Sequence, residues 1–102
     1  MHLSRLDIGP VSIPNGVLLA PMEDVTDLPF RVICRRLGAD AVYTEFINAE
    51  GLIRAEPGGG GRTLDKLRFL EEERPFGVQL YGAAGLSMEK AARIATESGP
   101  DL

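Results

Sequence analysis

The sequence lacks tryptophan and has one cysteine and one histidine among its 102 residues. A single cysteine excludes an internal disulfide framework, and a single histidine leaves no ordinary zinc site, so no metal is expected. No apolar run approaches the ~20 residues that a membrane-spanning helix needs. The amino terminus also lacks the long apolar core of a signal peptide. These absences predict a cytoplasmic protein that does not bind membranes.

Positive charge is also scarce. The chain has 11 Lys and Arg against 15 Asp and Glu, a formal net charge of −4. Neutralising phosphates requires clustered Lys and Arg, so this stretch is not expected to bind nucleic acid by itself. Hydrophobic residues make up 44% and charged residues 25%, which is typical of an ordinary globular protein. The length suits one small domain with its own core.

The most informative stretch predicts a strand, a loop and a helix in immediate succession. Val17–Ala20 is a short apolar run suited to a strand that is buried on both faces. Pro21 ends this strand because proline cannot donate to a sheet ladder. A helix is then expected to begin at Thr26 or Asp27, with Pro29 in its first turn. In α/β proteins, ligands bind at the loop that follows the carboxyl end of such a strand.

The remaining elements alternate between strand and helix. A hairpin is predicted at residues 6–8 and 11–13, around a Gly9-Pro10 turn. The later expected elements are strands at 17–20, 41–44 and 76–81 and helices at 28–37, 64–72 and 88–98, the last capped by Ser87 and ended by Gly99. Residues 48–61 are expected to be a loosely structured loop, of which the glycine-rich part at 55–61 is flexible. Residues 100–102 have the pattern of a further strand. This β-α-β-α-β-α order predicts an α/β fold with parallel strands.

The first helix carries an apolar stripe at the i, i+3, i+4, i+7 spacing. Its members are Phe30, Ile33, Cys34 and Leu37. Arg31, Arg35 and Arg36 lie off the stripe and are expected in solvent, and Gly38 suits the left-handed residue that ends a helix. Cys34, being on the stripe, is expected to act as a small buried hydrophobe and not as a nucleophile.

Three motifs carry a resemblance to a known family. They are Ala20-Pro21-Met22-Glu23-Asp24-Val25-Thr26-Asp27-Leu28-Pro29-Phe30-Arg31, Tyr43-Thr44-Glu45-Phe46 with Gly51-Leu52-Ile53-Arg54, and Arg74-Pro75-Phe76-Gly77-Val78-Gln79-Leu80-Tyr81-Gly82. In this order and spacing they resemble the tRNA-dihydrouridine synthases, from about Leu6 to the last residue. The resemblance implies a (β/α)₈ TIM barrel, of which residues 1–102 are expected to be the amino-terminal hairpin and about three eighths of the ring.

The resemblance also implies an FMN-dependent oxidoreductase that acts in tRNA processing. Members of this family use NADPH to reduce FMN, and a hydride then passes to a uracil of tRNA to give 5,6-dihydrouridine, with a cysteine as general acid. That cysteine lies in an Asn-x-Gly-Cys-Pro motif after the fourth strand, so no catalytic residue is expected before Leu102. The FMN-binding lysine, the phosphate loops and the tRNA-binding helical domain are expected beyond that point too. Residues 1–102 alone are therefore expected to be inactive, and the full-length protein monomeric.

The implied FMN-binding residues are Pro21, Met22 and Glu23, by their backbone, and Gln79. From the residues alone, Pro21 could merely end a strand, Met22 could pack in the core, and Gln79 could bond a neighbouring loop. A buried amide seeks up to four hydrogen bonds, and leaving them unmade costs about 1–3 kcal/mol, so the edge of a flavin ring would satisfy Gln79. Glu45, at the end of the second strand, either orients the substrate base or another side chain, or holds the 48–54 loop.

Other interpretations stay open. Asp24, Thr26 and Asp27 look like a catalytic cluster but are interpreted as loop and cap residues. The chain could instead belong to another FMN barrel that acts on a small molecule, such as a dihydroorotate or ene reductase, or be a truncated, non-catalytic product. The motif wording argues against the first. Downstream DNA that encodes a fourth strand and its cysteine motif after Leu102 would argue against the second.

Overall fold

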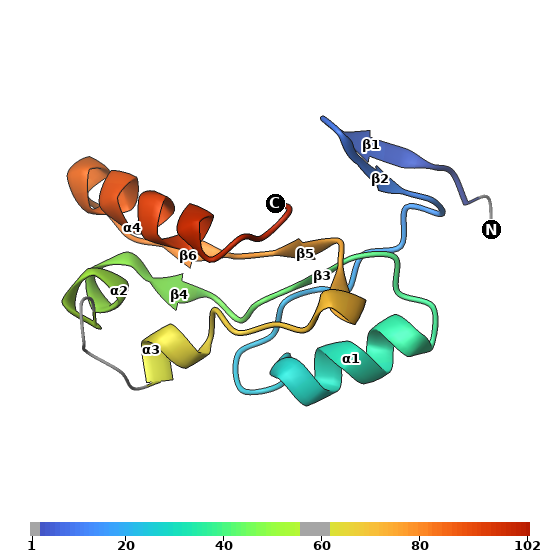
Figure 1. Ribbon diagram of the computed structural model, residues 1–102, viewed down its shortest axis with the longest axis horizontal. Coiled ribbons are helices and arrows are strands. Elements are labelled where there is room, and N and C mark those ends of the chain that lie inside the picture. Colours follow the sequence, from blue (N-terminus) through green and yellow to red (C-terminus); the bar gives the residue numbers. More distant parts are fainter. Residues whose placement is uncertain (1–2, 56–61) are drawn as a thin grey trace.

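The computed structural model describes residues 3–55 and 62–102. Its elements in chain order are β1 (Leu6–Ile8), β2 (Val11–Ile13), α1 (Leu28–Arg36), β3 (Val42–Tyr43), β4 (Ile47–Asn48), α2 (Ala49–Ala55), α3 (Arg62–Asp65), the 3₁₀ turn η1 (Glu71–Glu73), β5 (Phe76–Gly77), β6 (Leu80–Tyr81) and α4 (Gly85–Glu97). The β1–β2 hairpin lies at one end, and α2 and α4 lie at the other (Figure 1). The molecule is elongated, with principal extents of 43 × 26 × 21 Å. The predicted glycine-rich loop at 56–61 lies outside the described residues.

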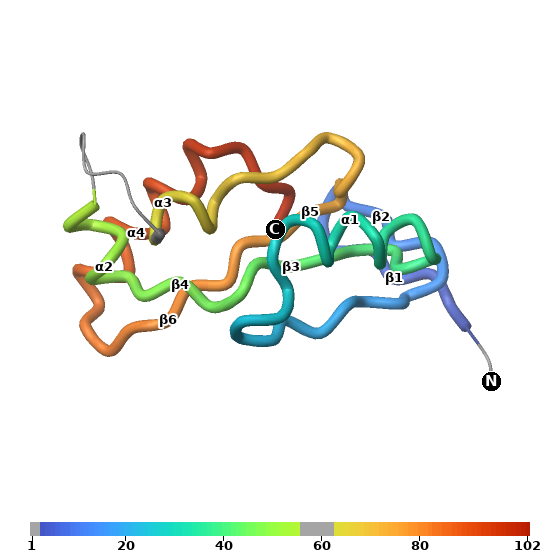
Figure 2. The backbone as a smooth tube through the Cα atoms, turned by 90° about the horizontal axis from the view of Figure 1, so that it is seen from below, coloured from blue at the N-terminus to red at the C-terminus, as the bar shows by residue number. Residues whose placement is uncertain are grey.

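Four extended segments lie side by side in chain order, which confirms the parallel α/β prediction. The Leu19 amide donates to the Ala41 carbonyl at 3.0 Å, and β3 pairs with β5 in parallel. The Val78 amide donates to the Leu102 carbonyl at 3.0 Å, so residues 101–102 lie beside β5 as the predicted further strand would. Figure 2 shows the segment before α1 running alongside β3. The predicted hairpin is confirmed as well, with β1 and β2 antiparallel.

The strands differ from the prediction in length and burial. Val17–Ala20 makes a single bridge, from Leu18 to Ala41, and Leu18 is 41% exposed, so this segment is not buried on both faces as predicted. The predicted strand at 76–81 is split into β5 and β6. Between Tyr43 and Ile47 the chain takes four steps while the partner takes three, from Gly77 to Leu80. The extra residue is a β-bulge, a feature that redirects side chains close to it.

Helix α1 begins at the predicted residue and ends one residue earlier than predicted, but it buries a different face. Asp27 caps it by accepting a hydrogen bond from the Phe30 amide at 3.1 Å, and Gly38 has the expected positive φ of 116°. The predicted apolar stripe is largely outside, however, with Ile33 55% and Leu37 83% exposed. Cys34 is only half-buried. Arg31, expected in solvent, is 3% exposed because it pairs with a buried carboxylate.

The prediction for residues 48–72 is wrong in two places. The segment expected to be a loop forms α2, which the Asn48 side chain caps by accepting from the amides of Glu50 and Gly51 at 2.8 and 3.2 Å. The helix expected at 64–72 is broken into α3 and η1, and Leu70 within this range is 48% exposed. Glu73, which ends η1, is fully buried and accepts a hydrogen bond from Arg31 on α1, so this stretch packs against α1 and does not continue as one helix.

An apolar core lies between α2 and α4. Its buried members are Ile47, Ala49, Leu52, Leu67, Ala91 and Ala95. Helix α4 starts earlier than predicted, so Ser87 lies within its first turn and not at its cap, and Gly99 ends it with a φ of 86°. The Ser87 hydroxyl donates to Glu50 and thereby joins α4 to α2. Within residues 3–55 and 62–102, no helix has the length and apolar character needed to cross a bilayer.

Asp40 fixes the turn that leads into the first parallel segment, and it yields a prediction about pH. Its carboxylate accepts from the amides of Asn15 and Val17, both at 3.0 Å. The bond from Val17, foremost, holds the pKa of Asp40 below its ordinary value of 3.8, although burial opposes the shift. A lowered pKa in the folded state adds stability above the unfolded value, and this is lost as the pH falls through the folded value.

We therefore expect Asp40→Asn to lower the urea midpoint at pH 7, and the difference from wild type to shrink between pH 4 and pH 3. Urea titrations of both proteins at pH 7, 4 and 3 provide the test. A difference that stays constant over this range would show that the ionised carboxylate adds nothing that an amide does not.

Candidate functional site

The carboxyl ends of the parallel segments border one open groove. It has a volume of about 500 Å³ and is lined by Leu18, Leu19, Ala20, Pro21, Tyr43, Val78 and Gln79. Pro21 and Gln79, which are distant in the sequence, therefore lie on the same mostly apolar surface. This edge of a parallel sheet is where α/β proteins bind ligands.

Gln79 presents a free side chain on a fixed backbone. Its amide donates to the Thr44 hydroxyl at 3.0 Å, and its carbonyl accepts from the Ile47 amide at 2.8 Å. The side chain is exposed, contrary to the expected burial, and makes no hydrogen bond to any other described residue. The carboxamide therefore has its donors and its acceptor available to a molecule in the groove.

Tyr43 is a wall of the groove that the sequence reasoning missed. Its ring lies directly over Gly77, where an added Cβ would come within 2.3 Å of the ring carbon Cδ1. Only glycine at position 77 allows this packing. The available signal was an aromatic residue on one strand opposite a glycine on the next.

The turn after Pro21 holds Met22 tightly. The Met22 amide donates to the Thr26 hydroxyl at 3.0 Å, and its carbonyl accepts from the amides of Val25 and Thr26 at 3.1 and 3.0 Å. The Met22 amide is thus already engaged, although its side chain is 39% exposed. Of the two predicted backbone donors here, the Glu23 amide alone has no partner among the described residues.

Glu45 binds a different loop from the one expected. It accepts a hydrogen bond from the amide of Asp24, a residue with a left-handed φ of 62°. The 48–54 segment is capped by Asn48 instead. Carboxylate oxygens of Glu23, Asp24 and Glu45 lie within 4.8 Å of one another, and Lys66 Nζ is 3.7 Å from Glu23. Such exposed acidic groups are common and do not by themselves make a metal site.

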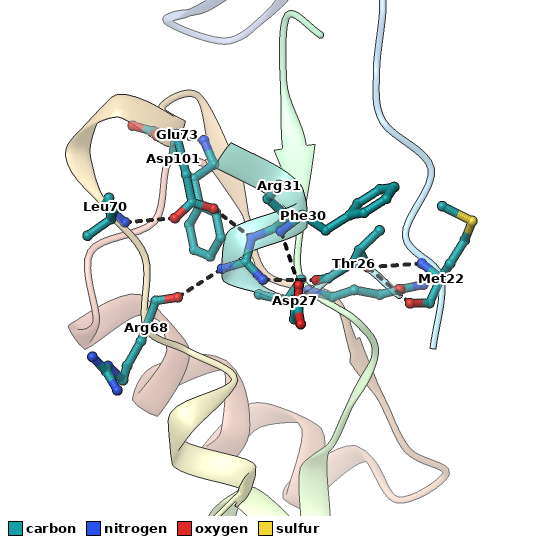
Figure 3. A network of polar contacts seen from close by, with 12 residues as sticks. Met22, Thr26, Asp27, Phe30, Arg31, Arg68, Leu70, Glu73 and Asp101 are labelled. Atoms are coloured by element: carbon teal, nitrogen blue, oxygen red, sulfur yellow. Dashed lines mark hydrogen bonds and ion pairs between the residues drawn. The ribbon is translucent and has the colours of Figure 1, made fainter. Parts of the chain in front are cut away.

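A buried ion pair anchors this loop from behind (Figure 3). Arg31 Nε lies 2.6 Å from a Glu73 oxygen, with the two side chains 3% and 0% exposed. Arg31 also donates to the Thr26 and Arg68 carbonyls at 3.0 and 2.9 Å. The second Glu73 oxygen accepts from the Leu70 amide at 2.7 Å. Thr26 and Asp27 are thus loop and cap residues, as interpreted from the sequence.

Comparison with known proteins gives a consistent result. The family model described as Dihydrouridine synthase (Dus) matches residues 18–102. The chain is 43% identical over 87 residues to a probable tRNA-dihydrouridine synthase of Aquifex aeolicus, which covers 84% of this chain and 26% of that protein. It is 34% identical over 102 residues to tRNA-dihydrouridine synthase B of Pseudomonas aeruginosa, covering 98% of this chain and 29% of the relative. The chain therefore spans between a quarter and a third of these curated relatives.

The contact between Glu45 and the loop gives a direct prediction. Glu45→Ala removes the acceptor of the Asp24 amide, whereas Glu45→Gln keeps an oxygen in the same place. Because a hydrogen bond contributes about 1 kcal/mol, hydrogen exchange at the Asp24 amide should accelerate roughly fivefold in the alanine variant. It should stay near the wild-type rate in the glutamine variant. Equal exchange in wild type and Glu45→Ala would mean that the carboxylate does not hold the loop.

Proposed function

This chain belongs to the dihydrouridine synthase family, and we propose that residues 1–102 form the amino-terminal part of the FMN-binding barrel of a tRNA-dihydrouridine synthase. The complete protein reduces uridine in tRNA to 5,6-dihydrouridine, with NADPH as reductant. The observation that carries the proposal is the groove in which Pro21 and the free carboxamide of Gln79 meet.

The strand order supports a barrel over other parallel sheets. In doubly wound sheets the order reverses, so that the first strand lies between the second and a later one. Here the first segment neighbours the second at Leu18 and Ala41, β3 neighbours β5, and β5 neighbours residues 101–102. Four parallel segments in unbroken chain order are what a (β/α)₈ ring requires.

The groove fits the flat ring of FMN chemically. Its walls are mainly aliphatic and aromatic side chains, which suit the faces of a planar ring. The Gln79 carboxamide offers both donors and an acceptor, which match the mixed edge of the flavin pyrimidine ring. The Glu23 amide adds one more donor from the loop. Met22, whose amide is occupied, is proposed to contact the ring through its side chain.

The residues of this chain would bind and orient the cofactor. FMN, when bound, supplies the hydride chemistry. Pro21, Tyr43 and Gln79 would hold the ring in the groove that they line. The general acid and the surface that binds tRNA are proposed to lie in other parts of the complete protein. Glu45, which accepts from the Asp24 amide, is proposed to orient the substrate base.

The test of function uses the full-length protein loaded with FMN. With NADPH and tRNA that lacks dihydrouridine, we expect dihydrouridine to form and NADPH to be consumed in equal amounts. Flavin-loaded protein that leaves tRNA unchanged but reduces a small alkene would contradict the tRNA assignment and favour another FMN barrel enzyme.

Gln79→Leu tests the cofactor site in the same protein. The change keeps the side-chain volume and removes hydrogen bonds to the ring, each worth about 1 kcal/mol, so the Kd for FMN should rise by about fivefold or more. The urea midpoint should change little, because the side chain is exposed and bonds no described residue. A variant that copurifies with a normal complement of FMN would place the cofactor elsewhere.

Residues 1–102 expressed alone are predicted to bind FMN weakly and to reduce no uridine. Parallel strands with uncovered edges associate with other chains, and the groove would lack the rest of the ring. Titration of the fragment with FMN, followed by quenching of flavin fluorescence, measures its affinity. Sub-micromolar binding, or dihydrouridine above a no-protein control, would show that the essential residues lie within this stretch.

A further inference from the structure

We infer that the buried Arg31–Glu73 pair, acting through Thr26, is a positioning device that fixes the loop beneath the flavin. This inference rests on the proposed function, since it assigns Pro21, Met22 and Glu23 to the cofactor site. Figure 3 shows the chain of contacts from Glu73 on η1, through Arg31 on α1, to Thr26 and Met22.

Arg31 bonds three separate segments of the chain at once. Its Nε meets Glu73, while its two terminal nitrogens donate to the carbonyls of Thr26 and Arg68. Its guanidinium carbon lies 5.1 Å from the centre of the Phe76 ring. A guanidinium fork is rigid and planar, so the acceptors must lie in fixed directions from one another. The position of Thr26 is therefore tied to those of η1 and β5.

Thr26 in turn fixes the backbone of Met22. Thr26 is fully buried, and its hydroxyl accepts from the Met22 amide at 3.0 Å and donates to the Met22 carbonyl at 3.1 Å. Both backbone polar groups of Met22 are thus bound to one side chain. Pro21 precedes this residue and Glu23 follows it, so all three proposed FMN contacts have their direction set by Thr26.

A contribution to stability alone does not account for the buried Arg31–Glu73 pair. Replacing a buried ion pair by neutral groups that fill the same volume is often neutral or even stabilising. Helix α1 and η1 are moreover joined by a second pair, Arg36 with Glu72 at 2.8 Å. That pair lies at the surface, with the Arg36 and Glu72 side chains 69% and 45% exposed. It links the same two elements without touching the loop and serves as a matched control.

The experiment compares four variants of the full-length protein. Arg31→Met with Glu73→Gln removes the pair, keeps the volume, and leaves an acceptor for the Leu70 amide. Thr26→Val removes only the hydroxyl, whereas Thr26→Ser retains it. Arg36→Met removes the control pair. For each we measure the Kd for FMN, the visible circular dichroism of the bound flavin, and the urea midpoint.

We expect the double variant and Thr26→Val to weaken FMN binding about tenfold, the effect of losing one or two hydrogen bonds, and to alter the visible dichroism. Thr26→Ser and Arg36→Met should stay within about twofold of wild type, since the hydroxyl bonds are kept in one and untouched in the other. Folded Thr26→Val protein that binds FMN with wild-type affinity and dichroism overturns the inference. If wild type itself binds no FMN, the proposed function fails instead.

A measurement on the unmodified protein covers the case in which the variants do not fold. Because FMN would bind the loop in the arrangement that Arg31 sets, its addition should slow hydrogen exchange at the Met22 amide and at Arg31 Nε. Exchange that is unchanged at both sites in FMN-loaded protein overturns the inference whatever the variants do.

Discussion

The arrangement of this chain depends on the buried guanidinium of Arg31, which requires hydrogen-bond acceptors from several segments. Once Arg31 leaves water, each of its three nitrogens needs an acceptor, because a buried charge without a partner is strongly destabilising. Glu73 and the Thr26 and Arg68 carbonyls supply these partners. The paired strands are only two or three residues long, so they impose little order. The loop before α1 and the stretch before η1 have no regular structure, and Arg31 bonds a backbone carbonyl in each of them.

Much of the fold could be predicted because its signals are local. Asp27 and Pro29 mark the start of α1, and Gly38 and Gly99 mark the ends of α1 and α4. The strand and helix order follows from short apolar runs between these marks. The buried face of α1 could not be predicted this way, since it is set by Glu73, 42 residues further along the chain. Helical periodicity favours an apolar stripe and gives no weight to a charge that finds a distant partner.

The candidate site could be predicted in part. The rule that ligands bind at the carboxyl edge, together with the family motifs, brought Pro21 and Gln79 to one place, and the groove contains both. The β-bulge between Tyr43 and Ile47 has no marker in the sequence. The bulged stretch contains Glu45, which accepts a hydrogen bond from the Asp24 amide and not from the 48–54 segment as expected. The sequence also did not indicate that the Met22 amide already has a hydrogen-bond partner. That partner is the hydroxyl of Thr26, four residues later in the chain. Family membership follows from the family model and the similar relatives, while the proposed activity depends on whether this groove binds FMN.

The most direct measurement is a crystal structure of the full-length protein with FMN bound. The account predicts the flavin ring against Pro21 and Tyr43, with its pyrimidine edge within hydrogen-bond distance of the Gln79 carboxamide. It also predicts Arg31 still bonded to Glu73 and to the Thr26 carbonyl. A ring that lies away from this groove, or a loop that binds FMN after Arg31 has left Thr26, would contradict the account.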